Sequence, residues 1–324
     1  MSAVIRMHAP GGPGAMVLEE AGLGQPSPGE VLLRQAAVGV NFIDVYHRTG
    51  IYPLPLPTGL GVEAAGVVEA VGEGVTGLAP GDRVAYAGGP PGAYAGARLF
   101  PAARLVTVPH GVTDEQAAAV LFKGITAQYL IRSVHPVGAG TAVLLYAAAG
   151  GVGSLLAAWA SHLGAMVIGV VSSPAKAAVA RAAGCAHVLL WGQDDIPAHA
   201  RALTDGKGVD VAYDSVGADT WAASLDALRS RGTMVSFGAA SGPVPPFDVS
   251  VLGAKGSLFL TRPSIAAYTA DPREYRDRAA EVFAALEAGI IHADVWKRYP
   301  LAAAADAHAD LEARRSSGSL LLLP

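Results

Sequence analysis

The chain has 324 residues, of which 23 are Lys or Arg and 27 are Asp or Glu, so its formal net charge is −4. This length predicts two domains, because domains commonly hold about 100–200 residues. Hydrophobic residues make up 52% of the chain, which excludes intrinsic disorder. The sequence has neither an uninterrupted apolar run of about 18 residues nor a block of Lys and Arg. We therefore expect no membrane-spanning helix and no attraction of nucleic acid through net charge.

The single cysteine and the first residues predict where the protein acts. Cys185 has no second cysteine with which to form a disulfide or a thiolate metal cluster, a pattern typical of a reducing intracellular setting. Residues 1–20 lack the apolar core of a secretory signal peptide. We expect a cytoplasmic protein.

The first 120 residues have the pattern of short strands separated by turns. Val-rich runs at 31–40, 64–71 and 83–87 predict strands, and Pro- and Gly-rich segments at 52–57 and 88–92 predict loops. An antiparallel β-barrel or sandwich is the expected architecture. An Ala-rich helix is expected to begin at Asp114, with Thr113 as its N-cap and Gln116 at its third position.

From about residue 140 onward, strands alternate with helices. The predicted strands are 143–146, 166–171, 187–190, 209–213 and 233–237. The predicted helices are 152–163, 174–183, near 196–203 and near 220–229. This alternation predicts βαβ units and a parallel sheet. A further strand at 257–260, an amphipathic helix at 274–288 and an apolar strand at 319–323 follow.

A glycine-rich loop lies between the first strand and the first helix of this α/β region. It runs from Ala148 to Gly153 and matches GxGxxG with Ala in the first position. A small first residue permits the tight turn, Gly150 lets the backbone approach a pyrophosphate, and Gly153 lets the helix pack closely on the strand. The amide groups and dipole of the helix N-terminus favour phosphate. We interpret the loop as a dinucleotide-binding turn, the alternative being a purely structural turn.

The end of the next strand bears on which dinucleotide is bound. An NAD site usually places Asp or Glu there to bind the adenosine ribose, but the chain has no carboxylate in this region before Asp194. Ser172, Ser173 and Lys176 could bind a 2′-phosphate instead. We favour NADP(H); the alternative is that Ser172 caps the following helix and Lys176 is an ordinary solvated charge.

Seven segments of the chain follow one another in a characteristic order. They are VGVNFIDVYHRTGIYP (38–53), GLGVEAAGVVEAVG (59–72), GDRVAY (81–86), AAAGGVGSLLAAWASHLGA (147–165), YDSVG (213–217), GTMVSFG (232–238) and LTRPS (260–264). On these segments the chain, from residue 38 to residue 324, resembles the zinc-free quinone oxidoreductases of the medium-chain dehydrogenase/reductase superfamily, the zeta-crystallin-like group. The resemblance implies an α/β fold with a GroES-like β-rich catalytic domain (1–122 and 265–324) and a doubly wound Rossmann domain (123–264). The C-terminal tail would complete the barrel.

The resemblance also predicts that the protein works without metal. At the positions where related alcohol dehydrogenases hold a catalytic zinc, the chain has Asn41, Val62 and Phe122, and only Glu63 remains. One carboxylate does not make a zinc site, which needs three or four protein ligands. The nine histidines show no metal-binding spacing, so we expect them at the surface or at helix ends.

The resemblance assigns candidate site residues. Asn41, Tyr46, Tyr52 and Thr126 would lie beside the nicotinamide as the catalytic set. Asn41 or Tyr52 would donate to the substrate oxygen, and Thr126 would bond the nicotinamide amide or ribose. The expected cofactor contacts are Asn41, Tyr52, Thr126, Gly150, Gly151, Val152, Gly153, Ser172, Ser173, Lys176, Trp191, Ser215, Phe237, Gly238, Thr261, Arg262 and Ser317.

Several of these residues have structural alternatives. Trp191 would contact the adenine or serve as a packing anchor, Tyr46 could be a packing residue, and Arg262 could be a structural ion-pair partner. Asp44 could be taken for a general base, but we expect it to bond local backbone.

We expect an NADPH-dependent quinone reductase. A reductase of α,β-unsaturated aldehydes or ketones is the close alternative, because it would use the same fold and loop. A non-catalytic nucleotide- or RNA-binding role is the alternative from another class, and the net charge argues against RNA. The apolar strand at 257–260 would be an exposed edge in a monomer, so we expect a homodimer formed through the Rossmann domain.

Overall fold

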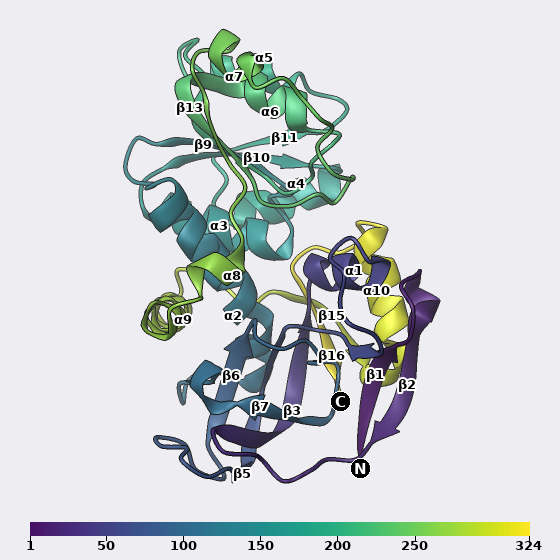
Figure 1. The fold of residues 1–324 in the computed structure, drawn as a ribbon. Coiled ribbons are helices and arrows are strands. Elements are labelled where there is room, and N and C mark those ends of the chain that lie inside the picture. Colours follow the sequence, from purple (N-terminus) through teal and green to yellow (C-terminus); the bar gives the residue numbers. More distant parts are fainter. The chain divides into compact units, whose positions relative to one another are not determined.

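The computed structural model describes all 324 residues and divides into two compact units (Figure 1). Unit 1 consists of Met1–Lys123 and Thr269–Pro324, and unit 2 is Gly124–Tyr268. The sequence-based boundaries were 122/123 and 264/265, so each lies slightly before the corresponding boundary of the structure. No helix combines the length and the apolar character needed to cross a bilayer.

Unit 2 is built on a six-stranded sheet in which every pair of neighbours is parallel. Its strands are β9 (Ala142–Tyr146), β10 (Met166–Val171), β11 (His187–Leu190), β12 (Val209–Asp214), β13 (Leu228–Ser236) and β14 (Phe259–Thr261). The spatial order is β11-β10-β9-β12-β13-β14. Numbered from β9, this is the 3-2-1-4-5-6 order of dinucleotide-binding doubly wound folds, so the predicted Rossmann architecture is confirmed.

Helices connect the parallel strands of unit 2. They are α3 (Gly151–His162), α4 (Pro174–Ala182), α5 (Ile196–Ala202), α6 (Trp221–Ala227) and α7 (Ser250–Ala254). A π-helical turn at Leu130–Val134 precedes β9, and α8 (Ile265–Tyr268) follows β14. All five residues of β9 are buried, as expected for a strand that is covered on both faces. The carboxyl end of β9 therefore meets α3 inside a rigid, close-packed layer.

Unit 1 contains two sheets. One is three-stranded, in the order β2 (Met16–Ala21), β1 (Ser2–Met7), β4 (Thr58–Gly59). The other follows the order β15 (Val295–Pro300), β16 (Ser319–Leu323), β3 (Glu30–Val40), β5 (Glu63–Val71), β6 (Arg83–Ala87), β8 (Val106–Thr107), and β7 (Ala97–Pro101) also pairs with β3. Its pairs are antiparallel except β15 with β16. As expected, the C-terminal tail joins the sheet of the β-rich domain, because β16 pairs with β3.

The helices of unit 1 are α1 (Phe42–Thr49), α2 (Asp114–Tyr129), α9 (Pro272–Glu287) and α10 (Ala304–Glu312), with 3₁₀ turns at Pro13–Ala15, Ala102–Arg104 and Leu301–Ala303. The predicted cap of α2 is confirmed. The Gln116 backbone N–H donates to Thr113 Oγ1 at 3.1 Å, and the Thr113 N–H donates to Gln116 Oε1 at 2.9 Å. The boundary between the units falls within α2, after Lys123.

Some elements differ from the sequence prediction. The strand expected at 257–260 is β14, which begins at Phe259 because Ser257 has a φ of 59°, outside the extended region. The helix expected near 220–229 ends at Ala227, because β13 begins at Leu228, five residues earlier than expected. Several short elements were not predicted, namely strands β1, β2, β4, β7, β8 and β15 and helices α1, α7, α8 and α10.

Candidate active site

The glycine-rich turn adopts the strand–turn–helix geometry that the sequence predicted. Gly150 is the N-cap of α3, and its N–H donates to the Ala147 carbonyl at 2.8 Å. A Cβ added to Gly153 would lie 2.2 Å from that carbonyl oxygen and 3.0 Å from the Ala148 Cα. Only glycine fits such an approach of α3 to the end of β9. The first-turn amides of α3, including those of Gly151 and Val152, thus start at the carboxyl edge of the sheet, where anions bind.

The end of β10 presents a hydroxyl and an ammonium rather than a carboxylate. Ser172 is exposed, and Lys176 is half-buried in the first turn of α4. Ser173 is the N-cap of α4, because its Oγ accepts from the Lys176 N–H at 3.4 Å. The structural alternative that Ser172 caps this helix is therefore wrong, and the cap lies one residue later.

Asp214 organises the turn that follows β12. This buried carboxylate accepts from the backbone N–H groups of Val216 and Gly217 at 2.8 and 3.0 Å. It also accepts from the Thr220 hydroxyl at 2.7 Å and from the Ser224 hydroxyl at 2.7 Å. With both oxygens bonded, the carboxylate fixes the turn in one conformation. The sequence analysis missed this role, although an Asp at a strand end followed by Gly and Thr is a signal for such a turn.

The structure brings Ser215 together with the segment that follows β13. A Cβ on Gly238 would lie 2.5 Å from the Ser215 carbonyl oxygen, and the Phe237 N–H donates to the Asp214 carbonyl at 2.8 Å. Arg262 follows β14, and its guanidinium donates to Ser236 Oγ at 3.3 Å. These predicted cofactor residues, together with Thr261, therefore lie at the carboxyl ends of neighbouring strands β12, β13 and β14.

Trp191 lies directly after β11 and packs against the apolar core of unit 2. Its ring meets that of Tyr146 edge to face, with centroids 6.0 Å apart. The packing-anchor interpretation of Trp191 thus has direct structural support, while its contact with an adenine stays a prediction.

A second group of candidate residues lies in unit 1, around the buried carboxylate of Glu63. Glu63 Oε1 accepts from Asn41 Nδ2 at 2.8 Å and from Lys123 Nζ at 2.6 Å, and Oε2 accepts from the Phe122 N–H at 2.9 Å. Glu63 is 0% exposed and Lys123 is 5% exposed. A Cβ on Gly39 would lie 2.1 Å from Glu63 Oε1, so this glycine makes room for the carboxylate.

This Glu63 cluster joins positions that the resemblance aligned with metal ligands. Asn41 and Phe122 stand where related zinc enzymes have cysteines, and both bond Glu63. Because a carboxylate only accepts, the bond to Glu63 orients the Asn41 amide, and its NH₂ group faces Glu63. The buried positive charge of the cluster belongs to the Lys123 ammonium, a residue that the sequence analysis did not include in the site. The described residues contain no group of three or more His, Cys, Asp or Glu that could hold a metal ion.

Asp44 lies in the first turn of α1 and is fully buried. Its Oδ2 accepts from the Asn41 N–H at 2.9 Å, the local backbone bond that the sequence predicted, and from the Tyr94 hydroxyl at 2.9 Å. Its Oδ1 is buried without a hydrogen-bond partner. Burial raises the pKa of Asp44 to about 7 because desolvation outweighs these hydrogen bonds.

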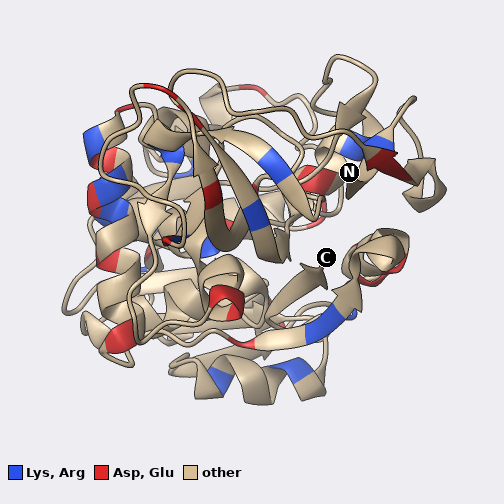
Figure 2. Ribbon diagram, turned by 90° about the horizontal axis from the view of Figure 1, so that it is seen from below, with Lys and Arg blue, Asp and Glu red and all other residues tan.

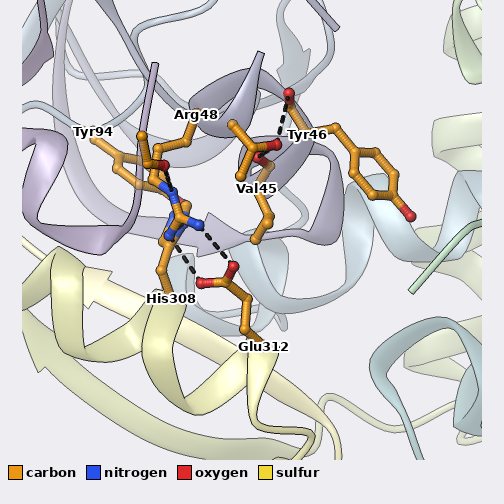
Figure 3. A network of polar contacts seen from close by, with 8 residues as sticks. Val45, Tyr46, Arg48, Tyr94, His308 and Glu312 are labelled. Atoms are coloured by element: carbon orange, nitrogen blue, oxygen red, sulfur yellow. Dashed lines mark hydrogen bonds and ion pairs between the residues drawn. The ribbon is translucent and has the colours of Figure 1, made fainter. Parts of the chain in front are cut away.

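A chain of polar contacts through Arg48, His308 and Tyr94 links α1 to α10 (Figure 3). Arg48 makes a bidentate pair with Glu312 at 2.7 and 2.9 Å and lies 3.3 Å from His308 Nδ1; His308 Nε2 lies 2.9 Å from the Tyr94 hydroxyl. Because arginine only donates, we assign the hydrogen of the neutral His308 ring to Nε2. The three bonds from Arg48 to His308, from His308 to Tyr94 and from Tyr94 to Asp44 then all donate toward Asp44, whereas the pair with Glu312 donates away from it.

His308 corrects one expectation from the sequence. We expected the histidines at the surface or at helix ends, but His308 is 0% exposed within α10. Burial lowers its pKa to about 3, so it is neutral at physiological pH. This network is absent from the sequence prediction because its members lie more than 200 residues apart in the chain.

The remaining predicted residues lie at separate places. Tyr46 is buried on α1 and Tyr52 is 39% exposed in the loop that follows, with ring centroids 5.2 Å apart in an edge-to-face contact. Thr126 lies one turn after Lys123 on α2. Ser317 is half-buried before β16 and belongs to unit 1, whereas the glycine turn belongs to unit 2.

Comparison with known proteins identifies the family. The family model for the alcohol dehydrogenase GroES-like domain matches residues 27–110, and the model named zinc-binding dehydrogenase matches residues 151–282. The quinone oxidoreductase of Pseudomonas aeruginosa is 46% identical over the full length of both chains. This chain belongs to the quinone oxidoreductases of the medium-chain dehydrogenase/reductase superfamily.

Two further members of the superfamily are similar over the same length. The 2-haloacrylate reductase of a Burkholderia species is 47% identical over 100% of this chain and 99% of its own. The solved structure of the Escherichia coli quinone oxidoreductase complexed with NADPH matches with a TM-score of 0.97 and 42% identity, covering 99% of this chain and 100% of the other.

Proposed function

We propose that the protein is an NADPH-dependent reductase of quinones. The observation that carries the proposal is the close approach of Gly153 to the Ala147 carbonyl, since it forms a dinucleotide-binding turn at the start of α3. The full-length identity of 46% with a quinone oxidoreductase supports the substrate class, and the likeness to an NADPH complex supports the cofactor.

The residues of unit 2 fit a dinucleotide. The amides at the start of α3 suit the pyrophosphate, and the turn held by Asp214 presents Ser215 at the same edge of the sheet. The residues proposed to bind the cofactor are Gly150, Gly151, Val152, Gly153, Ser172, Ser173, Lys176, Trp191, Ser215, Thr261, Arg262 and Ser317, with Asn41, Tyr52, Thr126, Phe237 and Gly238 at the nicotinamide end. Bound NADPH supplies a hydride to the acceptor.

The 2′-phosphate would lie against Ser172 and Lys176. Both residues follow β10, and neither Ser172 nor its neighbours up to Lys176 carries a negative charge that would repel the phosphate. Ser172→Asp tests this assignment, because Ser172 is exposed and does not cap α4. The variant should lose affinity for NADPH and keep its affinity for NADH, whereas an equal change for both nucleotides would contradict the assignment.

On the substrate side, Tyr52 is the proposed donor to the acceptor oxygen, with Tyr46 bracing its ring. Asn41 keeps one amide hydrogen beyond the one that bonds Glu63, and it is the alternative donor. The chemistry needs no metal in this proposal, because the Lys123 ammonium already neutralises the Glu63 carboxylate. A quinone is electron-poor and accepts hydride when it is positioned and its oxygen is hydrogen-bonded.

A reductase of α,β-unsaturated carbonyl compounds is the second candidate. The specific observation in its favour is the 47% identity with a 2-haloacrylate reductase over almost the full length of both chains. The two candidates differ in the acceptor and share the cofactor site. An RNA-binding role has less support, since Lys and Arg are scattered among Asp and Glu and separated by long uncharged stretches (Figure 2).

We further propose that the protein is a cytoplasmic homodimer that pairs β14 with its copy. β14 is an edge strand of the parallel sheet, and its Phe259 is 62% exposed. Unpaired apolar edges favour association. Phe259→Lys should convert a dimeric mass in light scattering at micromolar concentration to a monomeric one. A monomeric mass for the unaltered protein would contradict the proposal.

A fluorescence titration with NADPH and NADH, followed by addition of 1,4-benzoquinone or an enone, tests the function. Preferential binding of NADPH with rapid oxidation by the quinone is the expected result. Binding without quinone turnover, combined with turnover of the enone, would favour the second candidate. Failure to bind either nucleotide would refute the enzyme assignment.

A further inference from the structure

The Lys123 ammonium is a buried cation whose hydrogen-bonding capacity exceeds what the protein uses. An ammonium group carries three hydrogens. The only protein acceptor of Lys123 Nζ is Glu63 Oε1, at 2.6 Å. Two of the three donors therefore have no acceptor in the protein, although the residue is only 5% exposed. Burying a charge without satisfying its donors is costly, so we expect a water molecule or a bound ligand to accept from them.

The surroundings of Lys123 limit what those donors can bind. Glu63 is held by three donors, from Asn41, Phe122 and Lys123 itself, so the carboxylate cannot turn away from the ammonium. The Asn41 amide nitrogen and the Lys123 ammonium nitrogen bond the same oxygen, and each lies within 2.8 Å of it. One proposed substrate donor is thus adjacent to a fixed positive charge. An anionic or polarised oxygen is the partner that suits both groups.

We propose that Lys123 is a catalytic residue whose ammonium hydrogen-bonds the acceptor oxygen of the quinone or enone and stabilises the negative charge that develops there. The inference rests on the proposed function. Lys123 and Glu63 form a net-neutral pair, so the stabilisation comes from the two remaining N–H donors of the ammonium, which are held in place and need no reorganisation during reaction. Thr126, one turn further along α2, is the residue proposed to bond the nicotinamide.

The test needs a way to remove the cation without leaving Glu63 buried and unpaired. The variant Glu63→Gln keeps Lys123 and serves as the reference, and the double variant Lys123→Met/Glu63→Gln removes the charge of both residues. Relative to the reference, the double variant should lose about 10²-fold or more in kcat, with a larger loss for an enone than for 1,4-benzoquinone. The KM should change little, since the interaction strengthens as the oxygen becomes negative.

A binding experiment separates this proposal from the proposed function. 4-Nitrophenol ionises near neutral pH and absorbs visible light only as the phenolate, so it reports an oxyanion site without turnover. Bound to the unaltered protein saturated with NADP⁺, it should ionise at a lower pH than in solution. The reference variant should retain this shift, and the double variant should abolish it and bind the phenolate at least tenfold more weakly.

Three results would overturn the role of Lys123. They are an unshifted ionisation of the probe on the unaltered protein, no binding of the phenolate to it, and equal behaviour of the reference and double variants. The first two need no variant, so misfolding of either variant leaves the proposal testable. A protein that binds the phenolate through Lys123 but oxidises NADPH with neither quinone nor enone would refute the proposed function alone.

Discussion

Replacing Gly153 by alanine tests the geometry on which the nucleotide site depends. The new Cβ would lie 2.2 Å from the Ala147 carbonyl oxygen and 2.9 Å from the Ala147 carbonyl carbon, distances that side-chain carbons essentially never show. Both atoms belong to the backbone at the end of β9, so no side chain can turn aside. Relief requires α3 to move by about 1 Å, a displacement large enough to impair a binding site strongly.

The expected energies follow from two opposing effects. Alanine within a helix is favoured over glycine by about 1 kcal/mol, whereas forcing an extra carbon into a close-packed contact costs about 1–3 kcal/mol. With backbone on both sides of the clash, we expect the upper end of that range and a net loss of about 2 kcal/mol in the free energy of unfolding. The Kd for NADPH should rise at least about tenfold, which corresponds to 1.4 kcal/mol.

Gly253 provides a matched control. It also lies in a helix of unit 2, has ordinary backbone angles, and has nothing within 4 Å of an added Cβ. Gly253→Ala should therefore be neutral or stabilising by up to about 1 kcal/mol and should leave the NADPH affinity unchanged. Urea unfolding and a fluorescence titration measure both quantities. If Gly153→Ala matched Gly253→Ala in both, the proposed role of the turn would be wrong.

Three further predictions concern other buried groups. Burial raises the pKa of Asp44 from 3.8 to about 7, so the folded protein holds the carboxyl proton more tightly than the unfolded chain does, and the free energy of unfolding falls as the pH rises from 4 to 7. Asp44→Asn cannot titrate at this position, so its stability should rise relative to that of the unaltered protein over this range. A stability difference between the two proteins that does not change with pH would contradict the prediction. In urea unfolding, the double variant Arg48→Met/Glu312→Leu should lose less free energy of unfolding than the two single variants lose in sum, by about 1–3 kcal/mol. Additive losses would argue against an interaction between Arg48 and Glu312. Burial raises the pKa of the Cys185 thiol to about 12, so Ellman's reagent should label it only as fast as the protein unfolds, and rapid labelling at pH 8 would show the thiol to be accessible.

Elements with a strong local signal could be predicted from the sequence. The alternation of apolar runs with amphipathic segments predicted the parallel strands β9 to β12, and the cap at Thr113 predicted the start of α2. Strand β15 could not be predicted, because its sequence VWKRYP mixes apolar and charged residues and its pairing with β16 is set by tertiary contacts. Propensity is a weak guide where packing decides the structure.

The candidate site divides in the same way. The glycine turn has a sequence signature because backbone geometry demands glycine at Gly153. Glu63 and Lys123 have no such signature, since 60 residues separate them and a single lysine or glutamate is usually a solvated charge. Only the folded chain shows that both side chains are buried and bonded to each other.

The sheet of unit 1 has a consequence for how the protein is made. β16 (Ser319–Leu323) lies between β15 and β3, and Leu320 pairs with Val40. Unit 2 is contiguous in sequence and can fold before translation of the chain is complete. β3, in contrast, cannot form its pairing with β16 until some 280 further residues have been synthesised. Until residue 319 has emerged, part of β3 is an unpaired apolar edge of the kind that attracts other strands. Translation speed and chaperone binding should therefore affect the fraction of chains in which unit 1 folds correctly far more than the fraction in which unit 2 does.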